Sequence, residues 1–130
     1  MDAHHLSKRL TAVAQYVPQG ARLADIGSDH AYLPASLIIN HRINFAIAGE
    51  VAKGPFENEK KEIRQLGLEK VLIPRLADGL AAVTADDGID TVTIAGMGGS
   101  LIAKILDEGQ DRLSGVKKLI LQPNVGENRV

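Results

Sequence analysis

Five short apolar segments, separated from one another by longer amphipathic or polar stretches, constrain the fold of this 130-residue chain more than any other feature. They span residues 22–26, 45–49, 71–76, 91–95 and 118–122. The second, fourth and fifth are nearly continuous apolar runs, which is typical of strands covered on both faces of a sheet. Regular alternation of strands and helices predicts a parallel sheet with right-handed crossovers. We therefore expect a doubly wound α/β domain.

The segments between these strands are long enough for helices. Helices are expected over residues 31–40, 55–66, 80–85 and 100–112. A further N-terminal helix is indicated by one apolar stripe, formed by Leu6, Leu10, Val13 and Val17. The run from Pro18 to Gly20 ends this helix. Because Pro74 is disfavoured in a central strand, the segment 71–76 is expected at or near an edge of the sheet.

Composition excludes several classes of function. A chain of this length closes one hydrophobic core, so we expect a single domain. The absence of Cys excludes disulfides, zinc thiolates and a thiol nucleophile, and the adjacent His4 and His5 do not make a metal site. A net charge of -1 argues against holding nucleic acid by bulk electrostatics, and 3% aromatic residues are too few for a base-stacking platform.

The ends of the sequence lead to expectations about location and completeness. No apolar run approaches the ~18 residues that span a bilayer, and residues 1–5 lack the pattern of a signal peptide, so we expect a cytoplasmic protein. A doubly wound sheet usually continues beyond the point where this sequence ends. We therefore expect residues 1–130 to be the front part of a longer domain, cut after its fifth strand. The exposed edge predicts self-association of this chain, whereas a full-length parent is expected to be monomeric.

The loop after the first strand carries the most specific signal for a ligand. In an open α/β sheet, ligands bind outside the carboxyl ends of the strands. A dinucleotide site needs the pattern G-x-G-x-x-G, but the loop from Asp25 to Ala31 has only Gly27, and Asp29 stands where phosphates would lie. A carboxylate there repels phosphate and attracts a cation, which favours a sulfonium or ammonium ligand such as S-adenosylmethionine. An N-cap role for Asp29 is an equally weighted and compatible alternative.

Two further strand ends carry acidic residues. Glu50 lies about 20 residues after Gly27, at an offset where a carboxylate accepts both ribose hydroxyls of either NAD or S-adenosylmethionine. Asp78 with Gly79 follows the third strand, where the carboxylate can accept from an adenine amino group. A turn or an N-cap is the alternative for Asp78.

The last two strands end in glycines and amides. Glycines flank Met97 in the run from Ala95 to Gly99, so the backbone can pack under a flat ligand. Met97 then either covers the ligand or belongs to the core. Gln122 and Asn124 offer donors and acceptors that match the edge of a base, although a turn built on Pro123 is at least as good an interpretation.

Taken together and in order, these runs closely resemble the bacterial tRNA (adenine-N1)-methyltransferases of the TrmK family. The matching runs are residues 6–10, 24–34, 48–50, 54–56, 78–80, 94–99 and 121–124. The resemblance implies a Rossmann-like class I methyltransferase fold that uses S-adenosylmethionine, releases S-adenosylhomocysteine and methylates N1 of adenine 22 in tRNA. The family continues into a helical, coiled-coil-like domain that helps to grip tRNA. We therefore expect cofactor binding by this chain and doubt that it methylates tRNA alone.

The resemblance also implies roles for particular residues. The methionine part of the cofactor would be lined by Asp25, Gly27, Ser28, Asp29 and His30, with Arg9 facing the cleft from the N-terminal helix. Glu50 would hold the ribose, Asp78 and Gly79 the adenine, and Ala95, Gly96 and Met97 would flank the sulfonium. Asp29, Gln122 and Asn124 are the candidate catalytic residues.

The expected chemistry is in-line transfer of a methyl group to a lone pair. Adenine N1 is unprotonated at neutral pH, so alignment rather than a strong base would supply most of the catalysis. Two other classes remain open at this point: an NAD-dependent oxidoreductase, and a non-catalytic nucleotide- or RNA-binding module.

Overall fold

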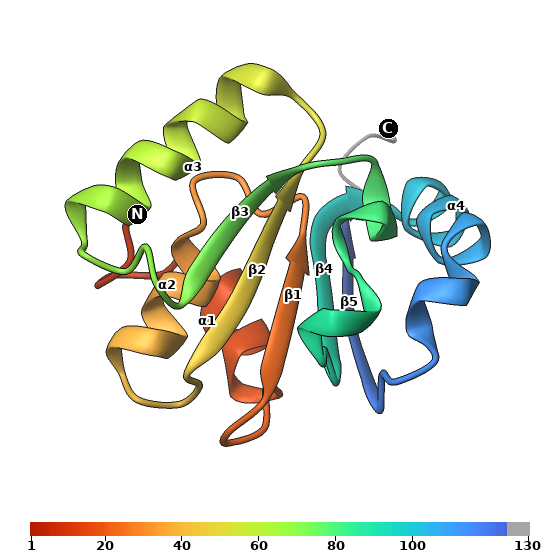
Figure 1. Ribbon diagram of the computed structural model, residues 1–130, viewed down its shortest axis with the longest axis horizontal. Coiled ribbons are helices and arrows are strands. Elements are labelled where there is room, and N and C mark those ends of the chain that lie inside the picture. Colours follow the sequence, from red (N-terminus) through yellow and green to blue (C-terminus); the bar gives the residue numbers. More distant parts are fainter. Residues whose placement is uncertain (125–130) are drawn as a thin grey trace.

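A five-stranded parallel sheet forms the centre of the computed structural model, which describes residues 1–124 (Figure 1). Residues 125–130, with which the expected domain ends, lie outside the described residues. The strands are β1 (Arg22–Ile26), β2 (Phe45–Glu50), β3 (Leu72–Leu76), β4 (Thr91–Gly98) and β5 (Lys118–Asn124). Their order is β3-β2-β1-β4-β5, which confirms the doubly wound α/β fold and places Pro74 on an edge strand. The direction of winding reverses between β1 and β4.

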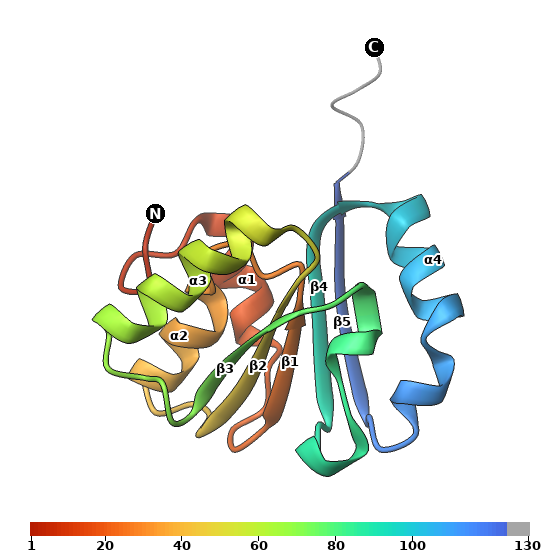
Figure 2. The same cartoon turned by 45° about the horizontal axis from the view of Figure 1, so that its top comes forward.

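Helices cover both faces of this sheet (Figure 2). They are α1 (Lys8–Gln15), α2 (Tyr32–Ile39), α3 (Lys53–Gln65) and α4 (Gly99–Glu108). The first three lie on one face, and α4 lies on the other with the short 3-10 helices η1 (Gly79–Ala82), η2 (Ala85–Asp87) and η3 (Gln110–Leu113). Within residues 1–124, no helix combines the length and the apolar character that crossing a membrane requires.

The two faces of the sheet bury separate hydrophobic clusters. Leu23 packs with Leu33 and Ile63 on the α1–α3 face, whereas Ala24 packs with Leu80 and Ile102 on the other face. Successive side chains of a strand point to opposite faces, so a strand covered on both sides is apolar at nearly every position. This burial explains the continuous apolar runs in the sequence.

The segment 80–85 does not form the helix that its length suggested. It forms η1 and η2 instead, because the Asp87 carboxylate accepts bonds from the Arg75 guanidinium, the Thr84 amide and the Thr84 hydroxyl. Arg75 also donates to the carbonyl of Ala82 at 2.8 Å. These hydrogen bonds satisfy polar groups of the segment within η1 and η2, and Arg75 connects the segment to β3.

The strand β5 runs through Pro123 to Asn124, so the alternative of a turn at Pro123 is wrong. Pro123 pairs opposite Met97, and the register shifts between Ala95 and Met97, which leaves Gly96 in a bulge of β4. Proline is tolerated here because β5, like β3, is an edge strand among the described residues.

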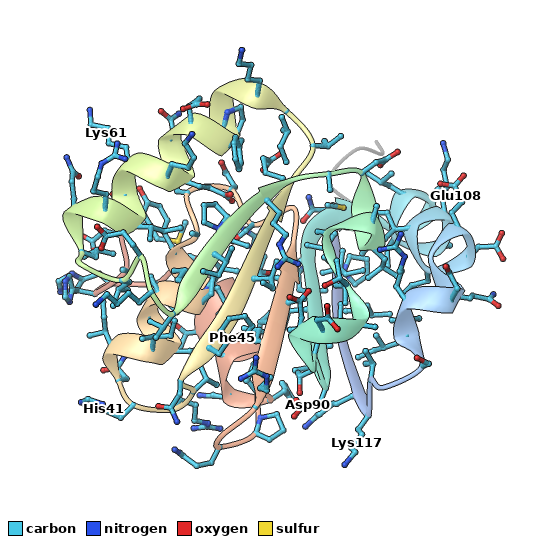
Figure 3. The ribbon with its side chains drawn as sticks, viewed as in Figure 1. His41, Phe45, Lys61, Asp90, Glu108 and Lys117 are labelled. Carbon is cyan, nitrogen blue, oxygen red and sulfur yellow. The ribbon has the colours of Figure 1, made fainter. Side chains whose placement is uncertain are left out.

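The amino-terminal end of the sheet is closed by contacts between its own residues. Figure 3 shows Phe45 and Asp90 at this end, where the strands begin. The Arg22 guanidinium lies 4.1 Å from the centre of the Phe45 ring, and Asp90 Oδ1 accepts from the Arg22 amide at 3.1 Å. The loops that follow β1, β2, β3 and β4, with their glycines and acidic residues, lie at the opposite, carboxyl-terminal end.

Candidate functional site

The loop after β1 has an unusual backbone. Gly27 has a φ of 70°, and the next positive values belong to Asp29 (42°), His30 (59°) and Ala31 (60°). For residues with a side chain this left-handed conformation costs roughly 1–2 kcal/mol each. Such strain is typical of sites where a loop must hold groups in fixed positions.

Asp29 does not cap the helix that follows this loop. The helix α2 begins at Tyr32, with Ala31 at the N-cap position and no side-chain capping bond, so the N-cap alternative for Asp29 is wrong. Its side chain is 75% exposed and approaches His30 Nε2 at 3.7 Å. The His30 ring stacks on Tyr32, with the ring centres 5.1 Å apart. The Asp29 carboxylate is therefore available to a ligand.

Asp25 forms the buried base of the same loop. Its carboxylate accepts one bond from Ser28 Oγ and one from Thr93 Oγ1, both at 2.8 Å. Burial raises the pKa of Asp25 to about 6, against the opposing effect of the two hydroxyl donors. Asp25 thereby joins the loop to β4 across the point where the winding reverses.

Glu50 and Asp78 stand at the ends of the next two strands. Glu50 Oε2 accepts from the amides of Val51 (3.0 Å) and Ala52 (3.2 Å), which leaves Oε1 free to accept from a ligand. Asp78 precedes η1 but makes no side-chain capping bond, so its carboxylate is not used as an N-cap. Both acids therefore keep acceptor oxygens at the carboxyl-terminal edge.

Two small cavities meet at this edge. The apolar cavity, of about 80 Å³, is lined by Ile26, Gly27, Gly49, Glu50, Val51, Ala77, Asp78, Gly79, Met97, Leu101 and Ile105. The polar cavity, of about 150 Å³, is lined by Met1, Arg9, Leu10, Asp25, Gly27, Ser28, Asp29, Leu33, Ala95, Gly96 and Met97. Gly27 and Met97 belong to both walls. Three larger hollows, of about 350, 310 and 380 Å³, contain no residue of β1 or β4.

Two amide side chains of β5 hold the bulge at Gly96. Gln122 Oε1 accepts from the Gly96 amide at 3.0 Å and from Arg9 Nη1 at 3.3 Å. Asn124 Nδ2 donates to the Gly96 carbonyl at 2.7 Å. Gly96 has a φ of 80°, and a Cβ there would collide with the Arg9 guanidinium. The amide side chains of Gln122 and Asn124, which the sequence suggested for contact with the edge of a base, are thus hydrogen-bonded to the backbone of Gly96.

The structure brings most of the expected site residues together. The walls of the two cavities contain every one of them except His30, Gln122 and Asn124, which lie beside the walls. Sequence reasoning missed the apolar residues Val51, Leu101 and Ile105. Val51 and Leu101 could have been noticed as hydrophobic residues in the first positions after a strand, where they are 65% and 48% exposed.

The arrangement suits a ligand with an apolar half and a polar half that carries a positive charge. The apolar cavity has the acceptors Glu50 and Asp78 at its rim, whereas the polar cavity has the carboxylates Asp25 and Asp29 together with the Arg9 guanidinium. In residues 1–124, no group of three or more His, Cys, Asp or Glu is placed to hold a metal ion.

Comparison with known proteins gives consistent matches. A curated Bacillus subtilis (strain 168) protein, the tRNA (adenine(22)-N(1))-methyltransferase, is 50% identical over 125 residues, which are 96% of this chain and 52% of that protein. A Streptococcus pneumoniae protein solved in complex with S-adenosyl-L-methionine is 52% identical with a TM-score of 0.91, over 95% of this chain and 57% of that one. M. capricolum TrmK, solved with S-adenosyl-homocysteine, is 33% identical with a TM-score of 0.83, over 95% and 54%.

These relatives are longer than the present sequence, which spans about half of their length. The family model described as "Methyltransferase domain" matches residues 6–130, and so nearly the whole chain. The parallel sheet, its winding order and this match confirm the expected class I methyltransferase fold. The chain therefore belongs to the methyltransferase domain family.

Proposed function

We propose that this chain binds S-adenosylmethionine across the two cavities that meet at Gly27. The observation that carries the proposal is the contrast between them, since the lining of the apolar cavity matches the chemistry of an adenosine half and that of the polar cavity the chemistry of a methionine half. Glu50 would accept from the ribose hydroxyls, and Asp78 from the adenine amino group. Asp29 would face the cationic half. The S. pneumoniae and M. capricolum relatives, solved with this cofactor and its product, support the assignment.

We further propose that the whole protein methylates N1 of adenine 22 in tRNA and works in the cytosol, where tRNA is found. The support is the similarity to the B. subtilis tRNA (adenine(22)-N(1))-methyltransferase over 96% of this chain. Because the chain spans 52% of that protein, the grip on tRNA is assigned to the whole protein rather than to this part.

The proposed reaction requires little proton transfer by the protein. Bound S-adenosylmethionine supplies an electrophilic methyl group on a positively charged sulfur. Adenine N1 attacks with a lone pair that is free at neutral pH, so no strong general base is needed. The residues of the chain then act by alignment, which can contribute roughly 7–11 kcal/mol. Asp29 would stabilise positive charge while it moves from sulfur to the base.

Gln122 and Asn124 remain proposed contributors to catalysis. Their bonds to Gly96 favour a positioning role, in which they hold the bulge of β4 beside the reacting atoms. Direct contact with the target base would require these bonds to be exchanged.

Titration calorimetry with S-adenosylhomocysteine and with NADH tests the cofactor assignment. We expect saturable binding of S-adenosylhomocysteine and none of NADH, because Asp29 repels a diphosphate. An Asp29→Ala variant should bind S-adenosylmethionine more weakly while it keeps its fold, as judged by circular dichroism. The matched control is Asp86→Ala, which removes an exposed carboxylate from η2, away from the crevice. Binding of NADH in preference would overturn the proposal.

Transfer of a tritiated methyl group to an unmodified tRNA tests the reaction. We expect the whole protein to label a tRNA with adenine at position 22 and to leave one with guanine at position 22 unlabelled. Cofactor binding without labelling by the whole protein would instead identify a non-catalytic binding module.

A further inference from the structure

Met97 lies at the junction of the two cavities. A Cβ built on Gly27 would overlap the Met97 Cε methyl, and the Met97 sulfur would lie 3.9 Å from it. The methyl group therefore rests directly on the Gly27 backbone. Since both cavities are lined by these two residues, the Met97 side chain stands as a wall between them.

The backbone of Met97 is held by pairing within the sheet, whereas a methionine side chain adapts readily by rotation. Met97 pairs with Pro123 just beyond the bulge at Gly96, which Gln122 and Asn124 clamp. The side chain is half-buried and packs against the edge of the cluster that contains Ile102 and Ile105. Methionine has three rotatable side-chain bonds and adapts to differently shaped surroundings. Rotation of the thioether is therefore the simplest way to join the two cavities.

We propose that Met97 is a movable divider, whose rotation away from Gly27 opens one continuous crevice for a ligand that spans both cavities. This inference rests on the proposed function, because only a ligand with two linked halves requires the opening. Adenosine, which lacks the methionine half and would occupy only the apolar side, would leave the divider closed. Met97 would thus help to distinguish the whole cofactor from its adenosine fragment.

Methyl NMR observes this divider directly. The chain has 2 methionines, so [¹³C-methyl]methionine labelling gives two signals, and a Met97→Leu variant assigns them. In the free protein we expect a nuclear Overhauser contact between the Met97 methyl and the Gly27 α-protons. Saturation with S-adenosylhomocysteine should abolish this contact and shift the Met97 signal, whereas saturation with adenosine should preserve the contact.

A remote methionine serves as the control. A Leu119→Met variant adds a methyl on the partly exposed outer strand β5, and its signal should stay in place with either ligand. The divider is refuted if the contact with Gly27 is absent from the free protein, persists with bound S-adenosylhomocysteine, or is lost with adenosine alone. Saturation is checked by calorimetry, so that failure of S-adenosylhomocysteine to bind counts against the proposed function rather than against the divider.

Discussion

At the scale of single residues, Gly96 illustrates how backbone contacts shape the crevice. Its amide donates to Gln122 and its carbonyl accepts from Asn124, both on β5. Arg9 covers the side where a Cβ would lie. A residue other than glycine would meet both the strained φ and the guanidinium. The bulge in turn places Met97 over Gly27.

Replacing Gln122 tests whether it positions Gly96 or only contacts a substrate. Gln122→Leu keeps much of the side-chain volume but leaves the half-buried Gly96 amide without its acceptor, which costs about 1–3 kcal/mol. We expect a loss of that size in the free energy of unfolding, measured with urea. Weaker binding of S-adenosylhomocysteine should accompany it, because the bulge lines the polar cavity.

Gln122→Glu is the matched variant, since a carboxylate can still accept from both Gly96 and Arg9. It should retain more of the stability and cofactor affinity than Gln122→Leu, and it gives up only the bond from Gln122 Nε2 to the Pro123 carbonyl. If Gln122→Leu leaves both quantities unchanged and lowers only methyl transfer, the side chain contacts the substrate and positions nothing.

The positions of the expected site residues at one edge of the sheet could be predicted, but their conformations could not. Acidic residues after parallel strands must gather at one edge, which placed Asp29, Glu50 and Asp78 correctly from the sequence alone. The left-handed backbone conformation from Asp29 to Ala31 could not be predicted from the sequence, because residues with a Cβ rarely adopt this conformation. For the same reason the N-cap alternative for Asp29 was attractive and wrong.

At the scale of elements, α3 carries a buried acid. Glu59 is fully buried, and neither of its carboxylate oxygens has a hydrogen-bond partner. Burial, with the nearby negative charges of Glu50, Asp25 and Asp29, raises the pKa of Glu59 to about 9. The side chain is therefore protonated in the folded protein at neutral pH.

This acid makes stability depend on pH in a defined direction. The ordinary pKa is 4.5, so between about pH 4.5 and pH 9 the unfolded chain loses a proton that the folded chain keeps. Stability from this group is fully present below pH 4.5 and falls as the pH rises towards 9. We expect Glu59→Met to raise the free energy of unfolding at pH 8 by on the order of 1–3 kcal/mol and to flatten its pH dependence.

Urea unfolding at pH 5, 6.5 and 8 measures this slope. Glu57→Gln, which changes an exposed acid on the same helix, should keep the slope of the parent protein. Asp25, with a raised pKa of about 6, adds a smaller dependence of the same sign below that pH, which should remain in Glu59→Met. Equal slopes for the parent and Glu59→Met would exclude the role given to Glu59.

Strands were more predictable than helices because burial on both faces leaves a direct pattern in the sequence. The run at 22–26 matches the whole of β1, whereas the run at 91–95 matches only the first part of β4, which continues to Gly98. The segment 80–85 misled because its structure depends on contacts with Arg75 and Asp87, which lie outside the segment and have no periodic signature.

At the scale of the whole molecule, the two edges of the sheet differ. On β5, Leu119 and Leu121 are each 41% exposed, and no further strand pairs with it in residues 1–124. On β3, Pro74 lacks an amide donor, which hinders pairing with another strand. We propose that two copies of this chain associate through β5.

Association is measured by sedimentation velocity over a range of protein concentrations. Leu121→Lys should shift the 130-residue chain towards monomer, because a charged side chain on an edge strand opposes strand pairing. Leu76→Lys, which places the same charge on β3, should leave the association unchanged. A parent chain that stays monomeric at high concentration would contradict the proposal.

The order of the strands in the sheet also determines when the crevice can form during synthesis of the chain. Asp25 is made early, yet its partner Thr93 belongs to β4, and the amides that clamp Gly96 belong to β5. When only β1, β2 and β3 have left the ribosome, the partial sheet is therefore incomplete. Its buried acid Asp25 still lacks the hydroxyl of Thr93 as a hydrogen-bond donor. Such distant pairing is slow to form and leaves unpaired strand edges exposed in the meantime. Capture of the adenosyl ligand by a growing polypeptide would consequently report that β4 and β5 have joined its sheet.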